Sequence, residues 1–149
     1  MMTQLQAAKA GTITSAMRQV AAGEQVDAAA VCAAVARGHA VIPLNPAHQD
    51  ALAVGVGRLF RTKVNANLGR STECSEGLGE RRKLKVALDA GADFVMDLSV
   101  GPDLAGIRQV LLDASPAPLG TVPIYETISR LAGAVPSMDV DLLLKVIAE

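Results

Sequence analysis

Three segments of the chain place polar side chains at the ends of predicted strands, where a packed strand gains nothing from them. In the first, Lys63–Gly69, the alternation of a strand puts Lys63, Asn65 and Asn67 on one face. Strands disfavour Asn, and buried amides require hydrogen-bond partners. This pair fits either a polar site at the carboxyl end of the strand or an Asn that caps the turn before Gly69.

The second segment is Val95–Ser99, in which Asp97 and Ser99 interrupt an apolar strand close to its end. In open α/β sheets and in (βα)8 barrels, ligands bind at the carboxyl ends of the strands. The alternative is that these side chains bond the following loop and the helix start near Gly101. Met96 lies between them, and a lone Met is typical of a core.

The third segment, Gly120–Glu126, contains Tyr125, the only tyrosine of the chain. We predict a strand over residues 120–125, with Tyr125 at its end and an acid after it. The alternative role is that of an amphipathic tyrosine at a layer boundary. Pro123 removes a ladder donor, so a bulge or an edge position is expected there.

Regular elements must position these groups. The first part is predicted to be helical, with one helix capped by Thr14 or Ser15 and another, 28–37, capped by Asp27 and stopped at Gly38. Two short strands, 40–44 and 55–60, form a predicted hairpin. Beyond it strands and helices alternate: strands over 62–68, 94–98 and 120–125, and helices over 77–90, 101–114 and 140–148, the last opened by Ser137 to Asp139.

This alternation predicts βαβ units, a parallel sheet and right-handed crossovers. Three strand–helix units are too few for a closed eight-stranded barrel, which takes at least ~200 residues. We therefore expect an α/β protein with a helical segment (1–38), a hairpin (39–60) and an open α/β layer or the first part of a barrel (61–149). Because the last helix is apolar and the next strand is missing, we expect the native polypeptide to be longer.

The composition excludes several classes of protein. The 149 residues include 14 Lys+Arg and 15 Asp+Glu, giving a net charge of -1, and only three aromatic residues. Neither an electrostatic nucleic-acid binder nor a base-stacking platform is expected. No run approaches the ~20 apolar residues of a membrane span. Cys32 and Cys74 are not in metal-ligand spacing and indicate reduced thiols in the cytoplasm.

Other candidate motifs favour structural explanations. Gly55 and Gly57 lack the third glycine of a dinucleotide loop. No acid–nucleophile pair is visible around His39 or His48. The basic cluster between Arg81 and Lys85 is typical of a solvated helix face rather than a phosphate clamp.

Taken together, the motifs resemble a family of radical S-adenosylmethionine enzymes, the phosphomethylpyrimidine synthases or ThiC family. The resemblance covers nearly the whole chain and rests on Met2–Leu5, Ala8–Thr14, Ile42–His48, Val64–Ser71, Gly91–Gly101 and Gly120–Tyr125. The last three of these motifs are long and specific.

The resemblance implies a (βα)8 barrel and a lyase-type rearrangement of aminoimidazole ribotide into the hydroxymethylpyrimidine phosphate of thiamine. In the family, a [4Fe-4S] cluster cleaves S-adenosylmethionine to a radical that attacks the ribotide, and a zinc ion is also bound. The residues that contact the ribotide fall here on Asn67, Met96 and Tyr125.

The departures limit what this chain does by itself. The CxxCxxxxC cluster motif, the two zinc histidines and the later barrel strands do not occur in it, so we assign no catalytic or metal-ligating residue and expect the chain alone to be inactive. Val100 replaces a usual Thr, and residues 73–82 also differ. These differences leave open the related 5-hydroxybenzimidazole synthase of anaerobic cobamide synthesis, which uses the same ribotide.

A non-catalytic alternative is a half-barrel that binds a phosphorylated ligand or assembles with a partner chain. An uncovered sheet edge and the apolar last helix make a homodimer the expected state.

Overall fold

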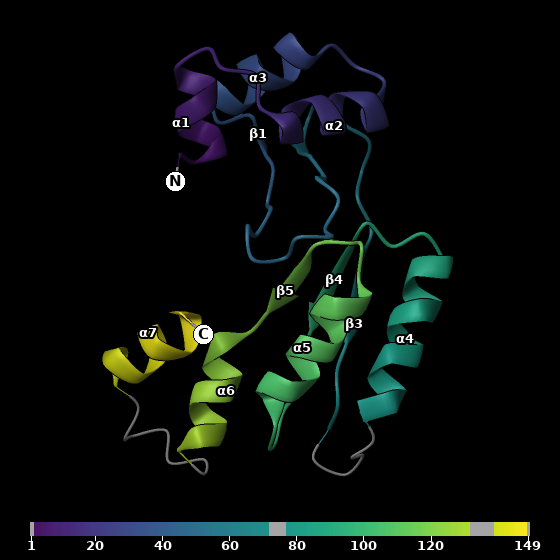
Figure 1. The fold of residues 1–149 in the computed structure, drawn as a ribbon, viewed down its shortest axis with the longest axis vertical. Helices are drawn as coiled ribbons and strands as arrows, with labels where there is room; N and C mark the ends of the chain where they lie inside the picture. The colour runs from purple at the N-terminus through teal and green to yellow at the C-terminus, as the bar shows by residue number, and fades with distance from the viewer. Residues whose placement is uncertain (1, 72–76, 132–138, 149) are drawn as a thin grey trace. The chain divides into compact units, whose positions relative to one another are not determined.

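The computed structural model describes residues 2–71, 77–131 and 139–148 (Figure 1). The chain divides into two compact units. The first comprises residues 1–64 and 116–118, and the second comprises residues 65–115 and 119–149. The predictions on Cys74 and Ser137 fall outside the described residues.

The first unit begins with three helices, α1 (Gln4–Lys9), α2 (Ser15–Glu24) and α3 (Ala28–Ala36). The Thr14 hydroxyl accepts the Met17 N–H at 3.2 Å, as the predicted cap requires. Asp27 occupies the N-cap position of α3 but makes no side-chain cap bond. The separate helix α1 was not predicted, because six residues are too few to show a helical period. Thr3 starts it through a capping box with Gln6.

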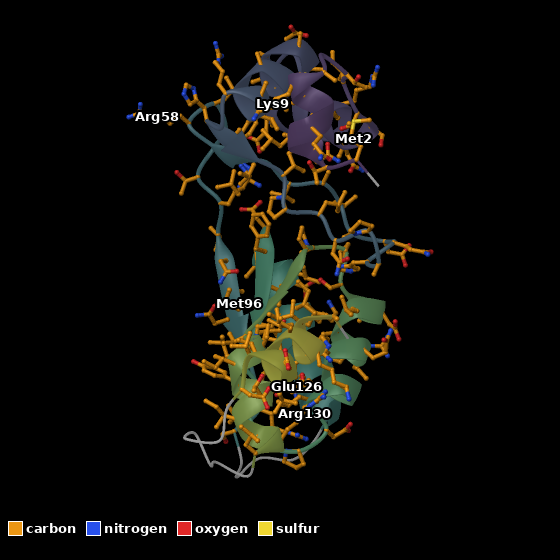
Figure 2. The ribbon with its side chains drawn as sticks, turned by 90° about the vertical axis from the view of Figure 1, so that its left-hand side faces the viewer. Met2, Lys9, Arg58, Met96, Glu126 and Arg130 are labelled. Atoms are coloured by element: carbon orange, nitrogen blue, oxygen red, sulfur yellow. The ribbon has the colours of Figure 1, made fainter. Side chains whose placement is uncertain are left out.

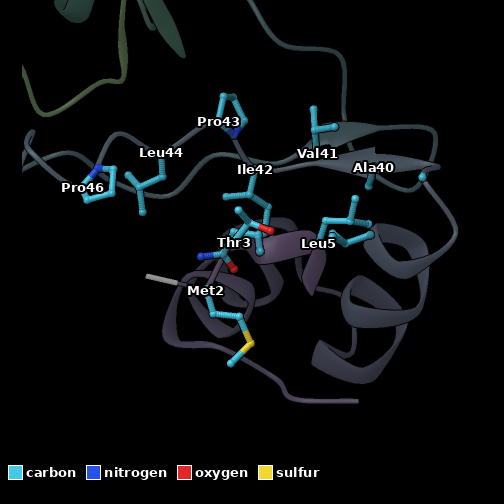
Figure 3. A pocket seen from close by; sticks show the side chains of 12 residues that line it. Met2, Thr3, Leu5, Ala40, Val41, Ile42, Pro43, Leu44 and Pro46 are labelled. Atoms are coloured by element: carbon cyan, nitrogen blue, oxygen red, sulfur yellow. The ribbon is translucent and has the colours of Figure 1, made fainter. Parts of the chain in front are cut away.

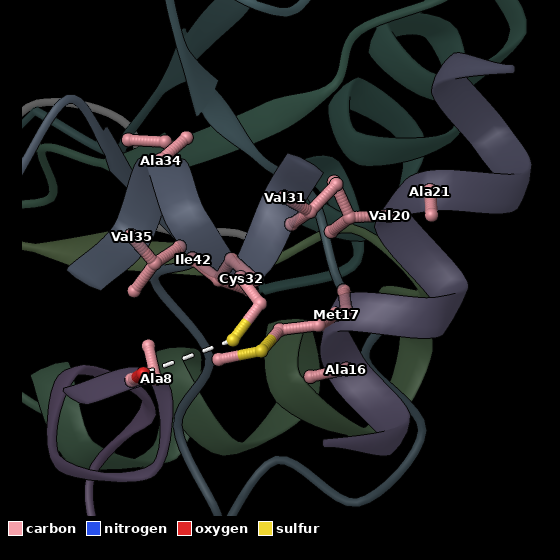
Figure 4. Close-up of a cluster of buried hydrophobic side chains, with 12 residues drawn as sticks. Ala8, Ala16, Met17, Val20, Ala21, Val31, Cys32, Ala34, Val35 and Ile42 are labelled. Carbon is pink, nitrogen blue, oxygen red and sulfur yellow. Dashed lines mark hydrogen bonds between the residues drawn. The ribbon is translucent and has the colours of Figure 1, made fainter. Parts of the chain in front are cut away.

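The core of the first unit is built from small side chains between these helices (Figure 4). Met17 and Val31 are fully buried, and each contributes about 1.5–3 kcal/mol by leaving water. Cys32 is buried among them, with its Sγ 3.8 Å from the Ala8 carbonyl oxygen. The prediction that this cysteine belongs to the core is confirmed.

The predicted hairpin exists but is shorter than expected. Strand β1 (Ala40–Val41) pairs antiparallel with β2 (Val56–Gly57) over two residues. Pro43 has no N–H to continue the ladder. Gly57 passes so close to β1 that a Cβ there would lie 2.6 Å from the His39 carbonyl oxygen.

The second unit is the predicted parallel α/β layer. Its three-stranded sheet has the order β3–β4–β5, with both pairs parallel. The strands are β3 (Asn65–Leu68), β4 (Phe94–Asp97) and β5 (Leu119–Thr121), and the helices are α4 (Gly77–Asp89), α5 (Leu104–Ala114), α6 (Pro123–Arg130) and α7 (Val140–Ala148). The mixed α/β class is thus confirmed, and continuation into a barrel stays a prediction. Among the described residues no helix has the length and apolarity needed to cross a membrane.

One face of this sheet is packed and the other is open. The right-handed crossovers expected of βαβ units place α4 and α5 on the same side of the sheet, and these two helices contact each other. Leu84 of α4, Leu111 of α5 and Val95 of β4 are each fully buried in this unit. Asn65 and Asn67 of β3 are exposed on the opposite face. The alternation predicted for this strand is confirmed for Asn65–Leu68, where the strand is formed. It is wrong for the two residues before it, since Val64 is 58% exposed and the side chain of Lys63 is buried against Glu24.

The predicted strand over residues 120–125 is wrong in its second half. Strand β5 ends at Thr121, and α6 begins at Pro123. Proline suits the first position of a helix, where its fixed φ is already helical and its missing N–H is not needed. The Tyr125 N–H then donates to the Val122 carbonyl at 3.0 Å. Tyr125 lies in the first turn of a helix, not at a strand end.

Candidate functional site

The candidate site begins with a row of residues across the sheet. Asn67 of β3 is in register with Met96 of β4, and Met96 is in register with Gly120 of β5. In a parallel sheet, neighbours in register point to the same face. The structure therefore brings two of the three predicted ligand residues side by side on the open face, near the carboxyl ends of their strands.

The two asparagines of β3 pair with each other. The Asn65 amide donates to Asn67 Oδ1 at 2.8 Å, and both residues are exposed. No other hydrogen bond of the Asn67 side chain occurs within the described ranges. Its own N–H groups are therefore available to donate to a ligand acceptor.

Met96 supplies an apolar surface beside this amide. It is half-buried, and its methyl carbon would lie 3.5 Å from a Cβ at Gly120, an ordinary contact distance. Because Gly120 has no side chain, the Met96 thioether packs directly over the backbone of β5. A flexible Met side chain in this position can adapt to the shape of a ring.

Asp97 and Ser99 follow the second of the two interpretations offered for them. Asp97 Oδ1 accepts the Ser99 N–H at 2.9 Å, and Ser99 Oγ accepts the Arg70 N–H at 3.0 Å. Both side chains are buried. They hold the loops that follow β3 and β4 together rather than facing a ligand.

Gly69 allows the two strand ends to approach. Its φ is +153°, and a Cβ there would lie 2.8 Å from the Leu98 carbonyl carbon and 2.9 Å from the Ser99 nitrogen. Hydrogen bonds of 2.9 Å continue the pairing past the strands, from Leu98 N–H to the Leu68 carbonyl and from Val100 N–H to the Arg70 carbonyl. No other residue type fits between these backbones.

A hollow of about 480 Å³ lies at these strand ends. The residues that line it come from β3, α4 and the loops after β3 and β4: Asn67, Leu68, Gly69, Arg70, Ser71, Lys83, Leu98 and Val100. Arg70 and Lys83 were not among the predicted site residues. The Arg70 guanidinium donates to the Pro102 carbonyl, and the Lys83 ammonium donates to the Gly69 carbonyl.

Lys83 belongs to the basic cluster predicted to be a solvated helix face, and the side chains of that cluster are exposed. The sequence carried one further signal, a Glu80–Lys83 pair at helical i, i+3 spacing. The contact with Gly69 had no such signal, because it depends on how α4 packs on β3.

Tyr125, the third predicted ligand residue, is 41% exposed in the first turn of α6. Its neighbour Glu126 is buried and paired with Arg108 of α5 at 2.7 Å and with Arg130 at 2.6 Å. Figure 2 labels Glu126 and Arg130 on α6. Burial raises the pKa of Glu126, but hydrogen bonds and charges from the two arginines outweigh it and leave the pKa below its usual value. The helix that carries Tyr125 is thus fastened to α5.

A second fastening joins α6 to the loop after β4. Ser129 Oγ donates to the Gly101 carbonyl at 2.8 Å. A small hollow of about 280 Å³ lies here, lined by residues of that loop, α5 and α6 that include Asp103, Glu126 and Arg130. The buried acid of this hollow, Glu126, is already paired with two arginines, and Asp103 is exposed to solvent.

The first unit has its own hollow, of about 770 Å³, between α1 and the segment that contains β1 (Figure 3). Its lining is almost wholly apolar and includes Leu5, Val35, Ile42 and Leu44. None of the described residues that line it has a titratable side chain.

The described residues do not fit an iron–sulfur cluster or a zinc site. Across residues 2–71, 77–131 and 139–148, no three His, Cys, Asp or Glu side chains gather where a metal ion could be held. Cys32, the cysteine within these ranges, is buried in the core of the first unit.

These features define a class of protein: a parallel α/β layer with a polar and a thioether side chain side by side near the carboxyl ends of its strands. Ligands bind at this position in α/β sheets.

Comparison with known proteins then gives the family. The model of the Radical SAM ThiC family matches residues 3–149, and the chain belongs to that family. It is 50% identical to the phosphomethylpyrimidine synthase of Moorella thermoacetica over 149 residues, covering 98% of this chain and 34% of that protein. It is 51% identical to that of Halobacterium salinarum over 148 residues (99% and 31%), and 45% identical to that of Methanocaldococcus jannaschii over 150 residues (98% and 35%). The chain spans about a third of the length of these curated relatives.

Proposed function

We propose that this chain forms part of the substrate site of a radical S-adenosylmethionine enzyme of thiamine biosynthesis, which converts aminoimidazole ribotide to hydroxymethylpyrimidine phosphate. The observation that supports this most strongly is the register of Asn67 with Met96 at the open strand ends, in a chain of the ThiC family. The relatives named above are phosphomethylpyrimidine synthases.

The part played by the described residues is to bind and orient the ribotide. The Asn67 amide, with its oxygen held by Asn65, donates N–H groups to an acceptor on the substrate. Met96 packs against the face of a ring, and Tyr125 presents its phenol from α6. In this proposal, residues other than those described bind the iron–sulfur cluster and the zinc ion and carry out the radical chemistry.

The test is the affinity of the protein, as its gene encodes it, for aminoimidazole ribotide by titration calorimetry. Asn67→Ala, Met96→Ala and Tyr125→Phe are each expected to weaken binding about tenfold, the loss of roughly one hydrogen bond or contact. Gln109→Ala, on the exposed side of α5, is the control and should bind like the wild type. Undiminished binding by all three variants would refute the proposed site.

Mass spectrometry of the reaction products separates this function from the benzimidazole-forming alternative. Supplied with the ribotide, S-adenosylmethionine and a reductant, the enzyme is expected to release hydroxymethylpyrimidine phosphate. Release of 5-hydroxybenzimidazole instead would assign the alternative. Binding without any product would support a ligand-binding half-barrel.

A further inference from the structure

The Lys83 ammonium joins α4 to the end of β3. Its Nζ lies 2.9 Å from the Gly69 carbonyl oxygen and 2.6 Å from Glu80 Oε1. Gly69 is the first residue after β3, and Asn67 is the second residue before it. The lysine thus contacts the backbone directly beside the predicted ligand residue.

A buried glutamate at position 80 lowers the stability of the fold unless its carboxylate is paired. Glu80 is 2% exposed, and its Oε2 has no hydrogen-bond partner in the part of the chain that the structure describes. A buried carboxylate loses most of its hydration and needs a fixed counter-charge. Lys83 is that counter-charge, and its position is thereby restricted although its side chain is 48% exposed.

The Gly69 backbone is therefore held from two directions. On one side it lies against Leu98 and Ser99 of the segment after β4, too close to admit a Cβ. On the other side its carbonyl is tied to α4 by Lys83. Asn67, Gly69 and Lys83 all line the same hollow, so a shift of Gly69 changes the hollow into which Asn67 faces.

We propose that Lys83, itself held by Glu80, is a positioning residue that fixes the carboxyl end of β3 and with it the binding geometry of Asn67. The effect on ligand affinity rests on the proposed function, whereas the effect on the backbone does not. Lys83 acts here through Gly69 and not through the reacting atoms.

The first test reads the backbone without any ligand, by hydrogen exchange in the protein as its gene encodes it. The reporters are the amides of Leu98 and Val100, which donate to the carbonyls of Leu68 and Arg70 on either side of Gly69. In Lys83→Met, exchange of both amides is expected to be about tenfold faster, because the loop opens locally more often. Unchanged exchange would overturn the proposal.

The matched control is Lys85→Met, the same change on the same helix. Lys85 pairs with Asp89 at 2.6 Å, but these side chains are 74% and 63% exposed, so the pair constrains little. Exchange at Leu98 and Val100 should match the wild type. Equal acceleration in both variants would mean a general loosening of α4 and would also overturn the proposal.

The second test measures ribotide affinity and separates this inference from the proposed function. Lys83→Met is expected to bind about five- to tenfold more weakly than the wild type, and Lys85→Met normally. A wild type that does not bind the ribotide would refute the proposed function, while hydrogen exchange would still decide the backbone part. A wild type that binds, with Lys83→Met binding equally well, would refute the inference alone.

Lys83→Met leaves the Glu80 charge buried without a partner, which can prevent folding. The double variant Glu80→Gln/Lys83→Met removes both charges and keeps the shapes similar. It is expected to fold, with the same accelerated exchange at Leu98 and Val100. Slow exchange in a folded double variant would overturn the proposal.

Discussion

Asn65 and Asn67 occupy strand positions that would be more stable with β-branched side chains. Their mutual hydrogen bond satisfies one amide with the other on an exposed face. Asn65 thus orients the side chain of Asn67. We therefore expect that a substitution of Asn65 can change ligand affinity without lowering the stability of the fold.

Asn65→Val makes that separation measurable. Stability is expected to stay equal or to rise by up to about 1 kcal/mol, because Val suits an exposed strand position. Ribotide affinity is expected to fall, because Asn67 loses the partner that orients it. Chemical denaturation and titration calorimetry on the same preparation provide the two numbers. A loss of stability with unchanged affinity would contradict the role given to Asn65.

Gly69→Ala tests the close approach of the strand ends. The added Cβ would meet backbone atoms at 2.8–2.9 Å in a φ region that side chains avoid, so a destabilisation of about 1–3 kcal/mol is expected. Gly79→Ala is the control, because a Cβ there meets nothing within 4 Å and alanine favours a helix. Its stability should equal or exceed that of the wild type in urea denaturation. Equal stability of both variants would show that the strand ends can separate.

At this scale the sequence predicted which residues share a face, and not what they touch. The period-two pattern correctly places Asn65 and Asn67 on the exposed face, but it fails at Lys63 and Val64, which precede the strand. The hydrogen-bond partners of Asp97 and Ser99 could not be predicted from the sequence, because the partner of Ser99 is Arg70, 29 residues away. Contacts across that distance depend on packing rather than on local pattern.

The helix α6 is the element on which Tyr125 depends. Glu126 connects it to Arg108 of α5, and Ser129 connects it to Gly101. With the pKa of Glu126 below its ordinary value of 4.5, the folded state binds this proton more weakly than the unfolded state does. The contribution of Glu126 to stability is therefore complete above about pH 4.5 and is lost as the pH falls through the lowered pKa.

Glu126→Gln is expected to cost about 1–3 kcal/mol at pH 7, because both arginines lose their counter-charge. The difference from the wild type should shrink as the pH is lowered from 5 to 3. Urea denaturation at several pH values measures it. Asp113→Asn, on the exposed side of α5, should stay within about 0.5 kcal/mol throughout. A pH-independent cost for Glu126→Gln would contradict the depressed pKa.

The elements themselves were largely predictable from caps, glycine stops and periodicity. The three parallel strands, the helices α2 to α5 and the helix opened by Asp139 all appear, the last with its Oδ1 accepting the Leu142 N–H at 2.6 Å. The helices α1 and α6 were not predicted. The helix α6 was missed because the apolar pattern around Pro123 fits two interpretations. A proline can lie in the last part of an edge strand, as predicted, or at the first position of a helix, as observed. Only the bonds of the first turn, such as Tyr125 N–H to Val122, separate the two.

At the scale of the whole molecule, α7 carries an apolar stripe that the described residues leave uncovered. Val140, Leu144 and Ile147 recur at helical spacing on one face and are 69%, 56% and 57% exposed. Such a stripe favours association, and we propose that the protein forms homodimers.

The 149-residue chain expressed alone is expected to self-associate in sedimentation velocity, and Leu144→Glu is expected to reduce the associated fraction. Lys145→Glu introduces the same side chain at the neighbouring exposed position, and it should leave association close to that of the unchanged chain. A wild-type chain that sediments as a single monomer at all concentrations would contradict this expectation.

The return of residues 116–118 to the first unit has a consequence for synthesis on the ribosome. The Leu52 N–H donates to the Pro116 carbonyl at 2.8 Å, and this partner is translated 64 residues later (116 minus 52). At about 5–20 residues per second, the amide waits several seconds for its acceptor. The first unit can therefore be completed only after β3, α4, β4 and α5 of the second unit have been translated.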